Sequence, residues 1–129
     1  MIEQSKKPFK ILLVDDDEIT NFITINKLKH LGFENVNAVE NGQLALKHLE
    51  KNYANLIVLD INMPVMDGFE FLSYVEENNL YNGTPIIILT SSGRPSDKET
   101  ADNYESVIDY LEKPLDFKKI QQILLKMNS

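Results

Sequence analysis

The sequence predicts an α/β fold in which a parallel β-sheet lies between two layers of helices. Short apolar segments alternate regularly with longer stretches of helical character along the 129 residues. Three of the apolar segments are nearly continuous hydrophobic runs, which is typical of strands buried on both faces of a parallel sheet. Repeated strand–helix units of this length favour a doubly wound α/β sandwich.

The first half of the chain supplies three of the expected strands. Phe9–Val14 is an apolar run, and the stretch Glu18–Leu31 after it carries apolar residues near a helical period. The common face of this helix holds Ile19, Phe22, Ile23, Asn26, Leu28 and Leu31. The strand Asn35–Val39, the turn Asn41-Gly42, the helix Gln43–Lys51 and the strand Leu56–Leu59 follow.

Capping signals locate the helices of the second half. Asp67 followed by Glu70 predicts a capping box at the start of a helix over Gly68–Glu77. Pro95, a residue favoured at the first helical position, predicts a helix over Ser96–Tyr104. The other expected elements are the turn Asn82-Gly83, the strands Pro85–Leu89 and Val107–Leu111, and the helix Asp116–Lys126.

Composition indicates one globular domain over residues 1–129, with Met1–Lys7 as a polar, frayed leader. The absence of cysteine excludes disulfides and thiolate metal sites. A net charge of −7 argues against nucleic-acid binding, which depends on neutralising phosphates with Lys and Arg. No apolar run is long enough to insert into a membrane and no signal-peptide pattern is present, so we expect a cytoplasmic protein.

Carboxylates stand at the ends of two predicted strands. Asp15, Asp16 and Asp17 follow the first strand directly, and Asp60 follows the third. Two carboxylates about 4 Å apart repel by roughly 4 kcal/mol at an effective dielectric near 20, so a cation or a retained proton is needed. Because ligands of such sheets bind beyond the carboxyl ends of the strands, we expect a shared divalent-cation site there. Asp17 is better explained as an acid at a helix N-terminus.

Four segments, each at a predicted strand end, resemble the receiver domain of two-component response regulators over nearly the whole chain. The resemblance is to the stand-alone, CheY-like members of that family. It implies a flavodoxin-like (βα)5 sandwich with the strand order 2-1-3-4-5. The matching segments are Ile11–Asp16, Leu59–Gly68, Pro85–Thr90 and Tyr110–Pro114.

The resemblance implies that Asp60 accepts a phosphoryl group from a sensor histidine kinase or a histidine phosphotransfer protein. A carboxylate attacks a polyanionic phosphoryl group only when charge is neutralised, which calls for Mg²⁺ or Mn²⁺. The implied metal ligands are Asp15 through a water, side-chain oxygens of Asp16 and Asp60, and the backbone carbonyl of Asn62. Lys113 and Thr90 would contact phosphoryl oxygens.

A switch is also implied, in which Thr90 moves toward the phosphoryl group and the ring of Tyr110 fills the vacated space. The surface formed by the fourth helix, fifth strand and fifth helix would then change and bind a downstream protein. Asn62 and Ser92 would tune the lifetime of the phosphoryl group. The Lys113-Pro114 bond is expected to be cis.

The family comparison leaves several points as expectations. Glu105-Ser106 stands where many receivers have Gly-Ala, which puts the loop before the fifth strand in question. His30 and His48 are expected to be surface residues, so the chain would be a phosphate acceptor and not an enzyme with an external substrate. A motility target, a separate effector and a relay role remain open, as do a monomer and a weak phosphorylation-dependent dimer.

Three other readings are less favoured. A haloacid-dehalogenase-like phosphatase would use Asp15 as nucleophile and Asp17 as acid, but it would leave Asp60 and Tyr110 unexplained. A flavin-binding module would need a loop rich in Ser, Thr and Gly after the first strand, whereas this loop is acidic. A scaffold that never becomes phosphorylated would not need the site residues at all.

Overall fold

Parallel strands form a single sheet in the order β2-β1-β3-β4-β5, as the sequence predicts. The computed structural model describes residues 8–80 and 83–128. Val14 of β1 pairs with Val39 of β2 and with Leu59 of β3, so these three strands end in register. The strands are β1 (Lys10–Val14), β2 (Asn35–Val39), β3 (Leu56–Leu59), β4 (Ile86–Thr90) and β5 (Val107–Glu112).

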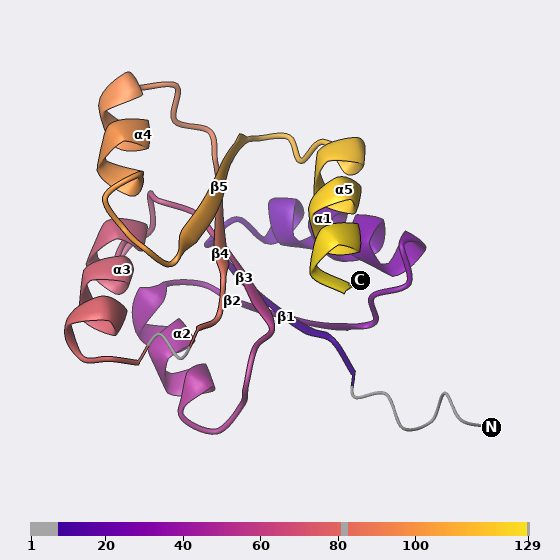
Figure 1. Ribbon diagram of the computed structural model, residues 1–129, viewed down its shortest axis with the longest axis horizontal. Helices are drawn as coiled ribbons and strands as arrows, with labels where there is room; N and C mark the ends of the chain where they lie inside the picture. Colours follow the sequence, from indigo (N-terminus) through magenta and orange to yellow (C-terminus); the bar gives the residue numbers. More distant parts are fainter. Residues whose placement is uncertain (1–7, 81–82, 129) are drawn as a thin grey trace.

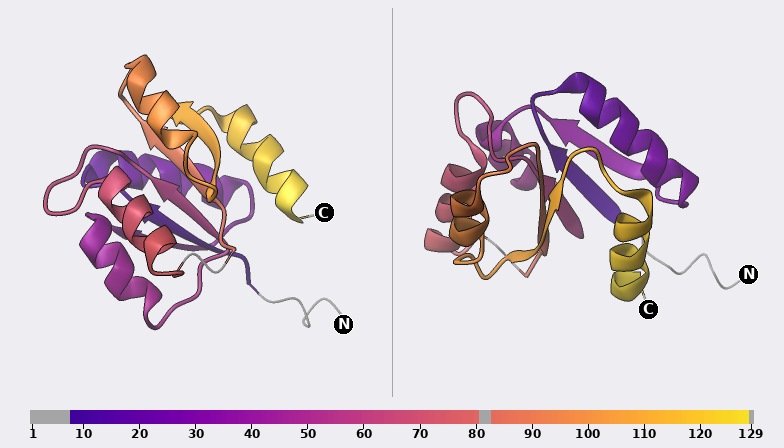
Figure 2. Two further views of the ribbon diagram at one scale, coloured as in Figure 1. Left: turned by 60° about the vertical axis from the view of Figure 1, so that its left-hand side comes forward. Right: turned by 90° about the horizontal axis from the view of Figure 1, so that it is seen from above.

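Helices cover both faces of the sheet, which gives three layers (Figure 1). The helices are α1 (Glu18–His30), α2 (Gly42–Leu49), α3 (Gly68–Glu77), α4 (Pro95–Ala101) and α5 (Phe117–Asn128). Helices α1 and α5 pack on one face, and α2, α3 and α4 on the other (Figure 2). Side chains of β1, β3 and β4 are buried along their whole length apart from Lys10, which confirms the prediction from their continuous apolar runs.

Most predicted boundaries lie within a few residues of the observed ones, and the largest difference is at α4. The sequence predicts a helix to Tyr104, but α4 ends at Ala101. Tyr104 instead stacks on Phe69 at 6.3 Å between ring centroids, and its hydroxyl lies 2.7 Å from Oγ of Ser73. Tyr104 therefore packs on α3 and does not continue α4. Residues 1–7 and Asn82, part of the predicted leader and turn, lie outside the described residues.

The apolar face predicted for α1 is buried only in part. Ile19 is 72% exposed and Phe22 is 67% exposed, whereas Asn21, Thr24 and Leu28 are buried. The Asn21 amide donates to the backbone carbonyl of Asp15 at 2.9 Å, which turns this polar residue inward. An apolar period on a helix of mixed composition does not reveal such a bond, so it does not show that Asn21 is buried while Ile19 and Phe22 are exposed.

The loop before β5, where Glu105-Ser106 stands in place of the Gly-Ala of many receivers, is held by hydrogen bonds to α3. Ser106 is fully buried, and its N–H and O–H donate to Oε2 of Glu76 at 3.0 and 2.7 Å. Glu76 lies in the last turn of α3. The Glu105-Ser106 departure is thus accommodated by a tie between α3 and the start of β5.

Among the described residues, no helix is long and apolar enough to cross a membrane.

Candidate functional site

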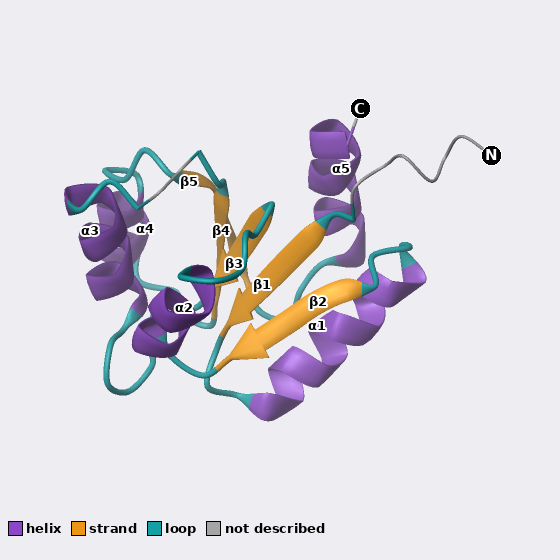
Figure 3. Cartoon of the chain, turned by 90° about the horizontal axis from the view of Figure 1, so that it is seen from below, coloured by secondary structure: helices purple, strands orange, loops and turns teal. Residues whose placement is uncertain are grey.

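Two buried carboxylates lie side by side where β1 and β3 end. The arrowheads of β1 and β2 point to this edge in Figure 3. Because Val14 and Leu59 are paired, the next residues, Asp15 and Asp60, become neighbours, and the Asp60 N–H donates to the Val14 carbonyl at 2.9 Å. Asp15 is 4% exposed and Asp60 is 6% exposed. The strand register thus places two buried carboxylates next to each other.

Asp16 completes an acidic cluster with these two residues. One carboxylate oxygen from each of Asp15, Asp16 and Asp60 lies within 4.8 Å of the others, and Asp16 is exposed. Such oxygens are the ligands that Mg²⁺ and Mn²⁺ prefer, and an exposed member leaves the site open to water. Asn62 lies in the loop after β3 and has an exposed side chain. The cluster therefore fits the predicted cation, and the ligand role of the Asn62 carbonyl stays a prediction.

Lys113, directly after β5, brings a cation to the same carboxylates. Its Nζ lies 2.7 Å from Oδ2 of Asp15 and 3.0 Å from Oδ2 of Asp60. The Lys113 N–H donates to the Thr90 carbonyl at 2.8 Å, which extends the β4–β5 pairing and fixes the side chain at this edge. The Lys113-Pro114 bond is cis, as predicted.

Burial and this ion pair act on the pKa values in opposite directions. Burial raises the pKa of Asp15 above its ordinary value, and Lys113 and the Asp17 N–H only partly offset that rise. Burial alone would lower the pKa of Lys113, but the hydrogen bonds to Asp15 and Asp60 outweigh it and raise that pKa. The lysine therefore stays charged at neutral pH.

Neighbouring backbone groups orient the acids. The Asp60 carboxylate accepts from the Ile61 N–H through Oδ1 at 2.7 Å, while Lys113 binds Oδ2. A Cβ on Gly68 would lie 2.4 Å from the Asp60 carbonyl oxygen, so only glycine lets α3 begin against this loop. The predicted capping box of Asp67 and Glu70 is present at that helix start.

Asp17 is the N-cap of α1, as predicted. Its Oδ1 accepts from the Ile19 and Thr20 N–H groups at 3.0 and 3.4 Å, and its Oδ2 accepts from the Thr20 hydroxyl. The Thr20 hydroxyl is the main cause that lowers the pKa of Asp17. This carboxylate is committed to the helix and is not a member of the acidic cluster.

The family model for the response regulator receiver domain matches residues 11–125. This chain belongs to that family. The chemotaxis protein CheY1 of Helicobacter pylori is 34% identical over 106 residues, covering 81% of this chain and 85% of that protein. The present chain is therefore a receiver domain of two-component signalling, as its sequence motifs predict.

Solved structures of receiver domains share the fold. A two-component response regulator from Cytophaga hutchinsonii has a TM-score of 0.84 at 27% identity, covering 95% of this chain and 98% of that one. The receiver domain of the sensor histidine kinase PA1611 from Pseudomonas aeruginosa has a TM-score of 0.82 at 28% identity, covering 95% and 100%. That structure holds a magnesium ion in its active-site cleft.

The predicted switch residues of this receiver domain, Thr90 and Tyr110, lie on the neighbouring strands β4 and β5. Thr90 is fully buried at the end of β4, and its Oγ1 accepts from the Ser92 N–H at 3.3 Å. Tyr110 of β5 is half-buried and packs against the apolar cluster on the side of α3. The Ser92 hydroxyl donates to Oδ2 of Asp97 at 2.5 Å, so it is held by α4.

Sequence analysis missed Asp97 and Arg94. Asp97 is 8% exposed and accepts from the Arg94 side chain as well as from Ser92. These bonds, the Ser92 hydroxyl first, lower the pKa of Asp97. The only available signal was the acid that follows Pro95 by two positions, which reads as an ordinary helix-start residue.

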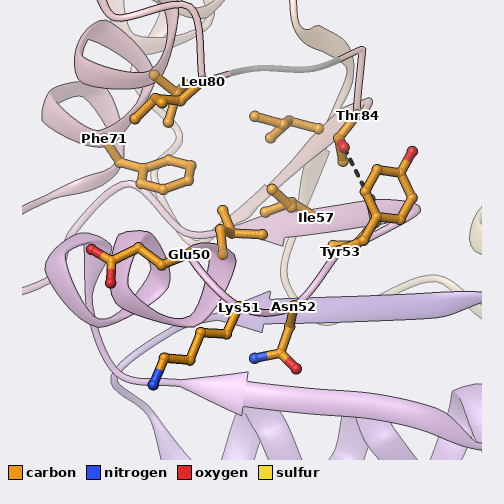
Figure 4. Close-up of a pocket in the computed structure, with 12 residues that line it drawn as sticks. Glu50, Lys51, Asn52, Tyr53, Ile57, Phe71, Leu80 and Thr84 are labelled. Atoms are coloured by element: carbon orange, nitrogen blue, oxygen red, sulfur yellow. Dashed lines mark hydrogen bonds between the residues drawn. The ribbon is translucent and has the colours of Figure 1, made fainter.

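A cavity of about 230 Å³ lies at the opposite end of the strands, near the start of β3 and β4 (Figure 4). Its lining includes apolar residues such as Ile57, Phe71 and Leu80, and Thr84 there donates its hydroxyl to the Ala54 carbonyl. None of the acidic cluster lines it. His30 and His48, on α1 and α2, also lie outside that cluster, so the chemically active groups gather at the carboxyl edge.

Proposed function

We propose that this receiver domain accepts a phosphoryl group on Asp60 from a phosphohistidine of a sensor histidine kinase or a histidine phosphotransfer protein. The observation that carries the proposal is the ion pair between buried Asp60 and Lys113, at 3.0 Å, inside a cluster of further aspartates. A buried nucleophilic carboxylate, a fixed cation and an open face for metal and phosphoryl group are what such a transfer requires.

In the proposed reaction, an Asp60 carboxylate oxygen attacks the phosphorus and the phosphorus–nitrogen bond of the phosphohistidine breaks. The electron pair of that bond returns to the imidazole, and Asp60 becomes an acyl phosphate. Lys113 balances negative charge on the phosphoryl oxygens, and the Thr90 hydroxyl donates to one of them. Both side chains already lie at the edge of the sheet that carries Asp60.

A magnesium or manganese ion would be held by Asp15, Asp16 and Asp60, with the Asn62 carbonyl as a further ligand. When bound, it supplies charge neutralisation between the nucleophile and the phosphoryl oxygens. The spacing of the three carboxylates, the open side at Asp16 and the magnesium ion of the related PA1611 receiver domain support this assignment.

The exposed apolar face of α1 supports delivery by a protein partner. Ile19, Phe22 and Ile23 are 72%, 67% and 46% exposed on the helix that begins directly after the acidic edge. An apolar patch beside a polar reactive centre is a feature of protein-binding surfaces. The signal would leave through Thr90 and Tyr110 to the α4–β5–α5 surface. The domain would transfer and lose its own phosphoryl group without turning over another substrate.

The phosphatase alternative is disfavoured by Asp17. That reading needs Asp17 as a free acid, but its carboxylate caps α1 through three hydrogen bonds. Steady hydrolysis of a phosphomonoester would revive the alternative.

The proposal is tested by intact mass after incubation with acetyl phosphate, with and without Mg²⁺. We expect one phosphoryl gain that needs the metal and is lost in Asp60→Asn. The absence of any gain in the unchanged chain would overturn the proposal and leave the scaffold reading.

A further inference from the structure

A chain of hydrogen bonds runs from the Thr90 hydroxyl into the first turn of α4. Oγ1 of Thr90 accepts from the Ser92 N–H at 3.3 Å, and the Ser92 hydroxyl donates to Oδ2 of Asp97 at 2.5 Å. Nε and Nη2 of Arg94 lie 3.2 and 3.1 Å from the same carboxylate oxygen. A movement of Thr90 toward Asp60 therefore either breaks the bond to Ser92 or pulls Ser92 away from Asp97.

The Ser92 hydroxyl has a single proton, and that proton is given to Asp97. While this bond lasts, Ser92 cannot donate to a phosphoryl oxygen or to an attacking water. Ser92, which is predicted to tune the phosphoryl lifetime, is therefore bound to α4 in this structure. A hydrogen bond to a buried carboxylate is stronger than one between neutral groups, so it resists the loop movement.

The Tyr110 hydroxyl lies in the same region and lacks a partner. It is buried, and among the described residues it makes no hydrogen bond. Ser92 and Arg94 line one cavity together with Tyr110, and both side chains are bound to the Asp97 carboxylate. Burial raises the pKa of Tyr110 above its ordinary value. A buried hydroxyl without a partner is destabilising, and this one has a carboxylate close by that is already occupied.

Helix α4 runs beside β5, the strand that carries Tyr110 (Figure 2). Lys98 of α4 lies 5.8 Å from the centre of the Tyr110 ring. Arg94 and Lys98 line the same cavity as Tyr110, and Asp97 holds the Arg94 side chain there. Asp97 is the acceptor among them, and it is buried.

We propose that Asp97 is a positioning residue of the phosphorylation switch that exchanges partners. In the unphosphorylated chain it holds the Ser92 hydroxyl; in the phosphorylated chain it accepts from the Tyr110 hydroxyl. The exchange rests on the proposed phosphorylation of Asp60. Asp97 keeps a hydroxyl donor in both states, and the phosphoryl group selects between the two arrangements.

Beryllofluoride with Mg²⁺, a mimic of the phosphoryl group, provides the test. We expect Ser92→Ala to raise the affinity for beryllofluoride about three- to tenfold, and Tyr110→Phe to lower it by a similar factor, the effect of one net hydrogen bond. In the Asp97→Ala background both effects should vanish, since each acts through Asp97. Asp97→Leu, which also removes the acceptor, serves in its place if the alanine variant does not fold.

Asp102→Ala is the matched control, because Asp102 is an exposed acid at the other end of α4, paired with Lys98 at 4.0 Å. Both effects should persist in that background. A ¹⁹F resonance from 3-fluorotyrosine at Tyr110, assigned by its loss in Tyr110→Phe, should move when beryllofluoride binds the unchanged chain. In Asp97→Ala it should move much less.

Two failures are distinguishable. If the unchanged chain does not bind beryllofluoride, the proposed function fails and the exchange fails with it. If it binds, and Ser92→Ala and Tyr110→Phe have the same effects with and without Asp97, the exchange alone is overturned.

Discussion

The ammonium of Lys113 lies 3.0 Å from Oδ2 of Asp60, although 53 positions separate the two residues in sequence. The contact exists because β3 and β5 both end at the carboxyl edge, with β4 between them. In the absence of a metal, this lysine is the cation that makes a cluster of buried acids tolerable. The proposed chemistry and the stability of the fold therefore depend on the same pair.

Replacement of Lys113 by methionine should separate these two roles. The variant leaves Asp15 and Asp60 without their cation, so we expect a loss of up to about 3–5 kcal/mol in the free energy of unfolding without metal, much of it restored by Mg²⁺. Phosphoryl gain from acetyl phosphate should slow by about a hundredfold. Urea unfolding and timed intact mass measure the two effects. Lys119→Met, on the exposed part of α5, is the control, and equal losses in both variants would refute the assigned role.

Mg²⁺ should stabilise the folded chain through the acidic cluster. At a concentration one hundred times the dissociation constant, a ligand specific for the folded state adds about 2.7 kcal/mol. We expect this rise in unmodified protein, measured by thermal unfolding, and its loss or strong reduction in Asp16→Asn. Asp17→Asn should retain it, because Asp17 caps α1. A similar metal response in both variants would argue against the assigned ligands.

The affinity for Mg²⁺ should fall with decreasing pH. The folded pKa of Asp15 is raised above its ordinary value of 3.8, so the folded chain binds this proton more tightly than the unfolded chain does. As pH rises from 3.8 through the folded pKa, ionisation of Asp15 lowers the stability of the metal-free chain and favours metal binding. Calorimetric titrations across this range check the sign. An affinity that increases toward acid pH would contradict it.

Glu76 should contribute measurably to stability through Ser106. Glu76→Ala leaves the buried Ser106 N–H and O–H without their acceptor, and we expect a loss of about 1–3 kcal/mol in urea unfolding. Glu77→Ala, an exposed neighbour, should change stability little. If the two variants were equal, the tie between α3 and β5 would carry no energy.

The exposed face of α1 should matter for the protein donor and not for the chemistry. Phe22→Ser should leave acetyl phosphate labelling and stability nearly unchanged, because the ring is 67% exposed. Transfer from a phosphorylated histidine phosphotransfer protein should become several times slower. Leu125→Ser, at 63% exposure on α5, is the control. A slower reaction with acetyl phosphate would mean instead that Phe22 supports the site itself.

The sequence predicted the strand ends and their polar residues better than any other part of the structure. Continuous apolar runs that stop at Asp15, Asp60 and Thr90 predict both the parallel sheet and the convergence of polar groups, since the carboxyl ends of parallel strands meet at one side of the sheet. The family motifs then predicted the strand order, which the sheet confirms.

Hydrogen bonds made by side chains were the part that the sequence did not predict. The bond from Asn21 to the Asp15 backbone buries a polar residue of α1, and no periodicity signals it. The contact between Ser92 and Asp97 depends on how the loop after β4 turns into α4, which local residue preferences do not determine. Glu76 and Ser106 are 30 positions apart, and their pairing depends on where the end of α3 lies relative to the loop before β5.

The most direct test of the account is the location of the acyl phosphate. Borohydride reduction of the chain after treatment with acetyl phosphate and Mg²⁺ converts a phosphorylated aspartate to homoserine, which peptide mass mapping can locate. The account predicts homoserine at position 60 alone, and none when Mg²⁺ is withheld. Homoserine at position 15 or 16 would contradict the assignment of Asp60 as the phosphoacceptor.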